Sequence, residues 1–188
     1  MRRQSNPSAA IAAVALILLL FALIYWSSRR SSAPPPVTQG VAAPLGPADI
    51  YPDPSRTPGA ANPDITQENI QDTICNPRWS TRSVRPPEEY TSRLKREQLN
   101  DYGYSDTAMR DYEEDHLIPL ELGGNPRDPR NLWPEAYDTS IPDGGARSKD
   151  KVETYLRDQV CAGNLSLREA QTEIATDWYR VYVRSVRH

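Results

Sequence analysis

Residues whose side chains can transfer protons or bind a metal ion are concentrated between Glu113 and Glu153. His116 is the only histidine before the last residue, and it directly follows three acids, the last of which is Asp115. An imidazole exchanges protons near neutral pH, and carboxylate oxygens bind hard divalent cations. Taken singly, His116 can be structural, Asp115 can pair with an arginine, and Asn131 can be a turn residue. Taken together, these three residues predict a polar site at the edge of a hydrophobic core.

The elements that must position this site follow the order strand, loop, strand and helix. Residues 112 to 122 carry alternating and β-branched apolar positions, and the turn sequence Gly123-Gly124-Asn125-Pro126 comes next. We expect an extended stretch over residues 130 to 133. A helix is predicted over residues 147 to 161, where apolar side chains recur on one face and a glycine follows the end. This mixture of elements predicts an α+β fold.

Two further helices are predicted, one on each side of this region. The first covers residues 87 to 100, because Pro87 suits a first helical turn and an apolar pair follows at a spacing of four residues. We interpret Arg85-Pro86-Pro87 as the start of this helix and not as a ligand motif. The second helix begins at a capping box formed by Ser166 and Glu169 and continues toward the C-terminus. Its aromatic residues are predicted to lie in the core.

The segment from Tyr112 to Glu135 resembles the HNH, or His-Me finger, nucleases. The likeness rests on Asp-His, an apolar-Pro-Leu segment, Gly-Gly, and an Asn-Leu about 15 residues after the histidine. The resemblance implies a ββα-metal core with additional helices. It implies that His116 is the general base that activates a water, and that Asp115 binds a divalent ion, either Mg²⁺ or Mn²⁺. Asn131 would be a catalytic residue with His116, and it would either bind that ion or fix the loop that carries the base. The implied partner is DNA, or RNA.

The sequence departs from the common HNH pattern at two points. It has no second histidine on the predicted helix, and it has no CxxC pairs for a structural zinc. Asp150 is therefore the expected further metal ligand, and Lys149, Arg147 and Arg130 are the expected phosphate contacts. Residues 64 to 188 carry 17 Lys and Arg against 23 Asp and Glu, so a nucleic-acid partner requires a local basic patch. We interpret four other acids mainly as surface residues, with an outer-shell contact to the metal site by one of them as the alternative: Glu113, Glu114, Glu121 and Glu135.

The N-terminal third of the chain predicts a membrane anchor followed by a linker. Residues 8 to 26 form an uncharged and mostly apolar run of 19, which at roughly 1.5 Å per residue nearly covers a hydrocarbon layer of roughly 30 Å. Residues 1 to 7 would then be cytoplasmic. A cleaved signal peptide is the alternative, although its apolar stretch normally has only about 7 to 15 residues. Residues 27 to 63 include nine prolines and are predicted to be a disordered linker. Residues 64 to 188 would fold as one domain outside the cytoplasm, periplasmic or extracellular.

The two cysteines, Cys75 and Cys161, lie near opposite ends of the predicted domain. A disulfide between them would suit a protein that reaches an oxidising compartment. Two buried free thiols are the alternative. The part of the chain between Thr73 and Tyr179 also resembles a group of small exported bacterial proteins of undefined role, which favours export without indicating a substrate.

Three functions fit these patterns. The first is a membrane-anchored endonuclease that hydrolyses phosphodiester bonds. The second is a catalytically degenerate HNH fold that serves as a binding or scaffold module of the cell envelope, which the acidic balance and the missing helix histidine favour. The third is an unrelated peptidoglycan- or protein-binding domain, and it would leave Asp115, His116 and Asn131 apart in space. No particular protein partner is predicted.

Overall fold

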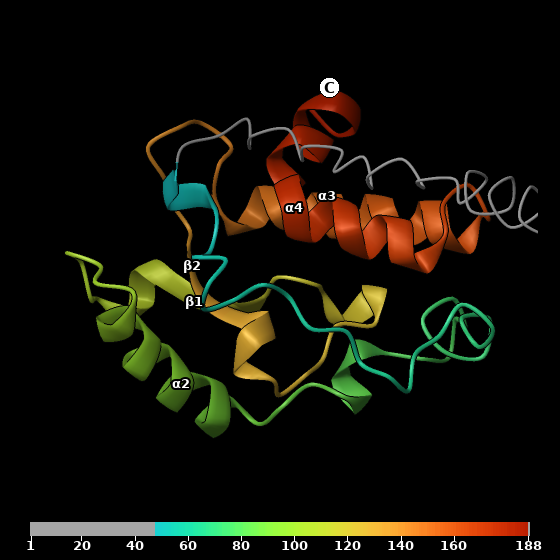
Figure 1. Ribbon diagram of the computed structural model, residues 1–188, viewed down its shortest axis with the longest axis horizontal. Helices are drawn as coiled ribbons and strands as arrows, with labels where there is room; N and C mark the ends of the chain where they lie inside the picture. The colour runs from blue at the N-terminus through green and yellow to red at the C-terminus, as the bar shows by residue number, and fades with distance from the viewer. Residues whose placement is uncertain (1–47, 188) are drawn as a thin grey trace, which may run out of the picture. The chain divides into compact units, whose positions relative to one another are not determined.

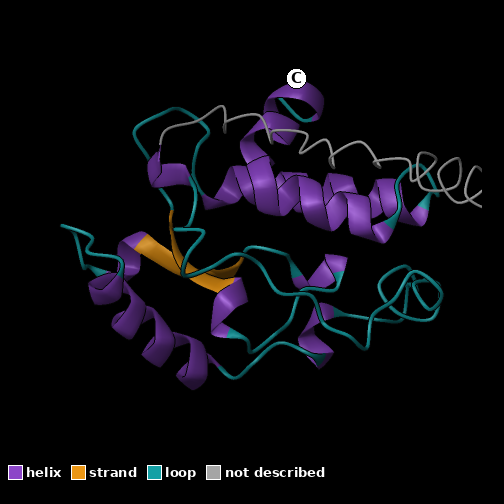
Figure 2. Ribbon diagram, viewed as in Figure 1, coloured by secondary structure: helices purple, strands orange, loops and turns teal. Residues whose placement is uncertain are grey.

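The computed structural model describes residues 48 to 187. In this part of the chain three α-helices accompany one two-stranded antiparallel sheet, so the fold is α+β as predicted (Figure 1, Figure 2). The elements are α2 (Glu88–Asp101), β1 (Tyr112–His116), β2 (Leu132–Ala136), α3 (Ala146–Cys161) and α4 (Leu167–Ser185). The anchor predicted over residues 8 to 26 lies outside the described residues. No helix within residues 48 to 187 combines the length and the apolar character that a bilayer crossing requires.

The hairpin of β1 and β2 determines which side chains share a face. Glu113 pairs with Glu135 and Asp115 pairs with Trp133 in the antiparallel register. Side chains alternate between the two faces of a strand, and directly paired residues lie on the same face. Glu113, Asp115 and Glu135 therefore point to one side of the hairpin.

The first strand is shorter than predicted. It ends at His116, and the chain then turns through a short 3-10 helix, Leu120–Leu122, to Gly123, which has a positive φ of 69°. Pro119 contributes to this early end, because proline has no N–H to donate to a strand ladder. The second predicted extended stretch also begins later, at Leu132, after a 3-10 turn over Pro129–Asn131.

Helices α3 and α4 pack side by side and supply most of the hydrophobic core (Figure 1). Val152, Leu156 and Val160 recur at helical spacing on α3 and are each at most 1% exposed. The predicted capping box of α4 is confirmed, because the Ser166 hydroxyl accepts from the Glu169 N–H and the Glu169 carboxylate accepts from the Ser166 N–H. The predicted bounds of all three helices agree with the structure to within about two residues.

The disordered linker predicted to reach Pro63 is wrong over residues 49 to 63, which belong to the folded unit. Ile50 is 1% exposed, and its carbonyl accepts a hydrogen bond from Trp178 Nε1 at 2.9 Å. Further along, the Gly59 N–H donates to the Arg130 carbonyl at 2.9 Å. A proline-rich segment can be ordered in this way because the surrounding loops satisfy its backbone polar groups.

The disulfide predicted between Cys75 and Cys161 is confirmed, with their Cα atoms 5.4 Å apart. It attaches the segment before α2 to the C-terminal end of α3. A second contact strengthens the attachment, since Arg157 on α3 donates from Nε to the carbonyl of the buried Ile74 at 3.2 Å. The chain is thus fixed at Ile74 and Cys75 against the C-terminal part of α3, the helix that also carries Asp150.

Candidate active site

Asp115, His116 and Asp150 line one pocket of about 260 Å³. The pocket lies where the end of β1 and the turn after it meet the N-terminal half of α3. The structure therefore brings together three of the residues that the sequence singled out. The other lining residues come from the same elements and from the segment before α2: Thr81, Arg85, Pro119, Leu120, Glu121, Glu153 and Thr154.

The ring of His116 is held in one orientation by the carbonyl of Pro126, which lies 3.1 Å from Nε2. A carbonyl oxygen only accepts, so Nε2 carries the proton and donates, and Nδ1 is left as the basic nitrogen; this tautomer is assigned from the hydrogen bond. His116 is only 5% exposed, and burial lowers its pKa below the usual value although Asp115 acts in the opposite direction. The imidazole is therefore neutral near pH 7.

The side chain of Asn131 fixes the loop that presents Pro126. Asn131 is fully buried, and its Oδ1 accepts from the backbone N–H groups of Ile118 at 2.9 Å and Ala60 at 3.2 Å. Its Nδ2 donates to the carbonyls of Ile118 and Asn125. Because every hydrogen-bonding position of the amide is occupied by backbone, the expectation of a metal-ligating or directly catalytic Asn131 is wrong. Fixing the loop, the other role left open by the sequence, agrees with this geometry.

Lys149 is fully buried beneath the pocket, so the expected phosphate contact by this residue is wrong. Its Nζ donates to Asp115 Oδ2 at 2.5 Å, to Glu153 Oε1 at 2.6 Å and to the His116 carbonyl at 2.9 Å. An ammonium has three protons, and all three are used. Burial alone would lower the pKa of Lys149, but the carboxylates of Asp115, Glu153 and Glu135 together raise it well above the usual value. Burial alone would raise the pKa of Asp115, but Lys149, Glu135 and His116 together lower it to about 2.

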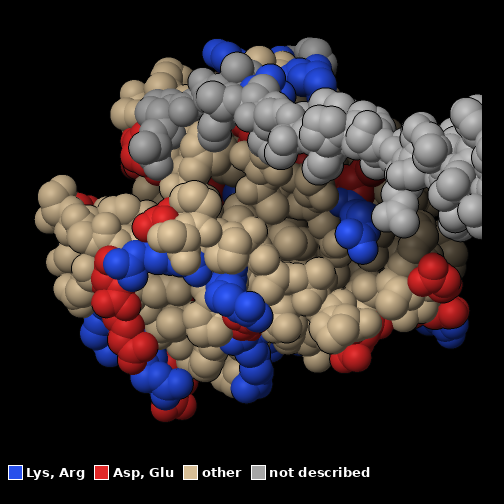
Figure 3. All heavy atoms as spheres, viewed as in Figure 1, with Lys and Arg blue, Asp and Glu red and all other residues tan. Residues whose placement is uncertain are grey.

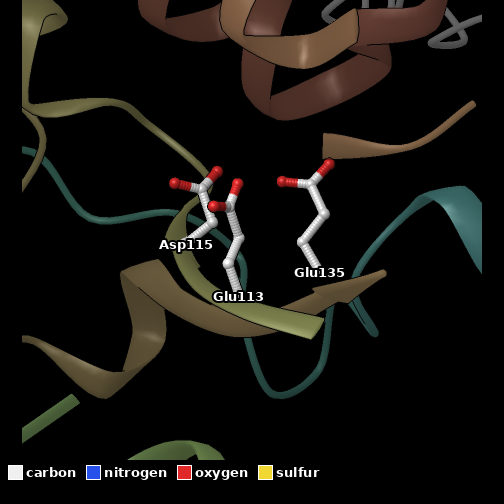
Figure 4. Close-up of side chains that lie close together, drawn as sticks. All are labelled: Glu113, Asp115 and Glu135. Carbon is white, nitrogen blue, oxygen red and sulfur yellow. The ribbon is translucent and has the colours of Figure 1, made fainter. Parts of the chain in front are cut away.

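Three carboxylates converge on the face of the hairpin that carries Asp115. Ligand oxygens of Glu113, Asp115 and Glu135 all lie within 4.8 Å of one another, and Figure 4 shows the three side chains projecting to the same side of the two strands. Glu135 is 2% exposed, and neither of its carboxylate oxygens has a hydrogen-bond partner. Its nearest cation is Lys149, with Nζ 3.8 Å from Oε2. Interpreting Glu135 as a surface acid was therefore wrong.

Negative charge is in excess throughout this region. Burial raises the pKa of Glu113 to about 7 and that of Glu153 to about 8, and it also raises the pKa of Asp150. Buried carboxylates in this number are either protonated or balanced by cations. Asp115, Asp150 and Glu153 line one pocket and carry carboxylate oxygens, the kind of ligand that hard ions such as Mg²⁺ and Mn²⁺ prefer. The carboxylate oxygens that lie within 4.8 Å of one another are those of Glu113, Asp115 and Glu135.

The arginines expected to contact phosphate do not line this pocket. Arg130 is paired with Asp128 at 2.6 Å, and the Arg147 guanidinium lies 5.7 Å from the centre of the Tyr137 ring. The pocket is instead lined by Arg85, which the sequence had suggested only as part of a helix start. On the face shown in Figure 3, basic and acidic side chains are interspersed, and neither sign covers that face continuously.

Comparison of the chain with protein-family models, with curated proteins and with solved structures gives no match. The HNH-like interpretation therefore depends on the motif residues and on the geometry described above.

Proposed function

We propose that the chain is a metal-dependent, HNH-like endonuclease that hydrolyses phosphodiester bonds in DNA or RNA. The observation that carries this proposal is that His116, neutral and held in one orientation, lines the same pocket as several carboxylates. The order β1, β2, α3 also supports a ββα-metal core, with Asp115 and His116 at the end of the first strand and Asp150 on the helix.

In this proposal His116 is the general base. Its Nδ1 takes the proton of the attacking water, while the Pro126 carbonyl keeps the ring in place through Nε2. Asn131 holds the loop that carries Pro126, and Lys149 holds Asp115 ionised. Asp115, Asp150 and Glu153 would hold the Mg²⁺ or Mn²⁺ ion, which when bound supplies charge neutralisation at the phosphate and at the leaving oxygen.

We also propose the location suggested by the sequence, with residues 8 to 26 as a single membrane anchor and the folded unit periplasmic or extracellular. The disulfide between Cys75 and Cys161 supports this location, because disulfides persist in oxidising compartments. Accessibility of the folded unit to an added protease in intact cells tests the proposal, and protection until the membrane is opened would contradict it.

Nuclease activity is tested with the full-length chain, purified in a mild detergent with its disulfide intact. Plasmid DNA, single-stranded DNA and RNA are incubated with Mg²⁺, Mn²⁺ or EDTA. The informative variant is His116→Gln, which retains a donor for the Pro126 carbonyl but has no basic nitrogen. The matched control is His188→Ala, which removes the only other histidine. We expect metal-dependent cleavage by the wild type and the control, and a loss of at least 100-fold in the His116 variant.

A second candidate is the catalytically degenerate envelope module, and one observation favours it. Lys149 binds both Asp115 and Glu153, and its single positive charge balances one of these carboxylates, so the protein itself balances part of the charge that a metal ion would balance. Titration with Mn²⁺, followed by the loss of the electron paramagnetic resonance signal of the free ion, separates the two candidates. A folded, oxidised protein that neither binds Mn²⁺ nor cleaves any of these substrates would establish the degenerate module and refute the nuclease.

A further inference from the structure

Among the residues that line the pocket, Arg85 is the one whose side chain is permanently positive. It is exposed, and within residues 48 to 187 its side chain has no hydrogen-bond or ion-pair partner. Lys149, which also acts electrostatically on His116, is fully buried and uses its three protons on Asp115, Glu153 and a backbone carbonyl. The positive charge that a ligand can reach in the pocket is therefore that of Arg85.

The remaining charge of the pocket wall opposes an anionic ligand. Asp115, Glu121, Asp150 and Glu153 all line it. Burial is the main cause of the lowered pKa of His116, and the charge of Arg85 adds to it, so the guanidinium lies within electrostatic range of the imidazole. A phosphate group next to His116 would thus have Arg85 as its cationic partner from the protein.

The backbone that carries Arg85 is fixed from both ends. We call residues 75 to 87 the Arg85 arm. At its first residue the arm is bound covalently to the end of α3, and at its last residue it continues into α2. Between these ends, the Arg85 N–H donates to the Thr81 carbonyl at 2.8 Å, and the following Pro86 is buried. The fixed backbone keeps Arg85 beside the pocket, so only the rotamers of its side chain remain to be ordered when a ligand binds.

We propose that Arg85 binds the non-bridging oxygens of the phosphodiester that enters this pocket. Arginine suits this role because its planar fork of N–H donors matches two phosphate oxygens. The inference rests on the proposed function, since it states how an acidic pocket accepts an anionic substrate. It also gives a function to Arg85-Pro86-Pro87 beyond the start of α2.

The test compares Arg85→Ala with Arg82→Ala. Arg82 is an exposed arginine three positions earlier in the same arm that does not line the pocket, so both variants remove one positive charge from the arm. Binding of a fluorescein-labelled single-stranded oligonucleotide is measured by anisotropy in Mg²⁺, in full-length chains that also carry His116→Gln to prevent turnover. Affinity is measured at several salt concentrations, because each phosphate contact contributes to the slope of log affinity against log salt.

We expect Arg85→Ala to weaken binding about 10-fold or more and to reduce the salt slope by about 0.7, as for one contact on a single strand. Arg82→Ala should change affinity less than about 2-fold, and Arg85→Lys should fall between the two because it retains charge without the fork. In the active chain, Arg85→Ala should lower kcat/KM by at least the same factor. A purely structural role for Arg85 would lower the melting temperature without changing the salt slope.

The outcomes separate this inference from the proposed function. If the wild type cleaves nucleic acid and the two alanine variants bind it equally well, the Arg85 inference is wrong and the nuclease proposal stands. If the wild type neither binds nor cleaves, both fail together. Loss of binding in Arg85→Ala alone, at an unchanged melting temperature, supports the inference.

Discussion

Replacing Lys149 with methionine should destabilise the folded unit strongly. Lys149 is the cation that lies among the buried carboxylates beneath the described pocket, and its Nζ donates to Asp115, Glu153 and the His116 carbonyl. Methionine fills a similar volume, so the apolar packing of the stem is retained while the charge is lost. Removing one partner of a buried ion pair costs about 3 to 5 kcal/mol, because the other charge is left uncompensated. Two carboxylates bind Lys149 directly, so we expect the upper part of this range near pH 8.

The loss should depend on pH. Without Lys149, the pKa of Asp115 rises in the folded state above that of the unfolded chain, and the pKa of Glu153, which burial already raises to about 8, rises further. A carboxyl with a raised folded-state pKa binds its proton more tightly in the folded protein, so the penalty grows as pH rises and is relieved as pH falls. The difference in unfolding free energy between wild type and Lys149→Met should therefore be largest near pH 8 and smaller near pH 5.

Urea unfolding at the two pH values measures this difference, with the fluorescence of the buried Trp133 and Trp178 as the signal. Lys151→Met is the matched control, because Lys151 is exposed and lies two positions away on α3. Its expected effect is within about 0.5 kcal/mol. If Lys149→Met costs no more than this control at pH 8, the buried charge network described here does not stabilise the protein.

Three further predictions concern the rest of the folded unit. Burial raises the pKa of Glu114 to about 8 from an ordinary 4.5, so the stability that its bound proton contributes is present below pH 4.5 and is lost as pH rises toward 8. Glu114→Gln should therefore flatten the fall in unfolding free energy between pH 5 and 8. An unchanged slope would show that Glu114 is solvated. The disulfide closes a loop of 87 residues, so the double variant Cys75→Ser, Cys161→Ser should have an unfolding free energy about 2 to 5 kcal/mol below that of the oxidised wild type. Equal urea midpoints for the two proteins would contradict this stabilisation. Ile50→Ala should cost about 2 to 4 kcal/mol in the same assay because Ile50 is 1% exposed, whereas a cost below about 0.5 kcal/mol would mean that residues 49 to 63 are not part of the core.

Local signals in the sequence were sufficient to predict the three helices. The capping box at Ser166 and the apolar spacing on α3 depend only on residues within a few turns, so both could be read without tertiary information. The segment over residues 49 to 63 could not be predicted in this way. Its order depends on contacts with distant positions such as Trp178 and Arg130, which composition does not report.

The parts of the candidate site formed by neighbours in the sequence could be predicted. The parts formed by strand pairing and tertiary packing could not. Asp115 and His116 are neighbours in the sequence, and both line the pocket. Glu113 shares the face of Asp115 through the two-residue period of a strand, a signal that the sequence contained. The burial of Glu135 follows from the strand register, and the role of Arg85 follows from the packing of its arm against α3. Neither can be obtained from spacing.

Lys149 and Asp150 show how one helix can serve both stability and binding. Consecutive residues on an α-helix point about 100° apart, so adjacent side chains can contact different surroundings. Lys149 lies toward the hairpin, where it is fully buried against Asp115, while Asp150 lines the pocket. Considered by residue type alone, Lys149 predicts a phosphate contact and Asp150 predicts a metal ligand. The hairpin packed against α3 separates them, because a lysine that faces buried carboxylates stabilises the fold and cannot reach a ligand.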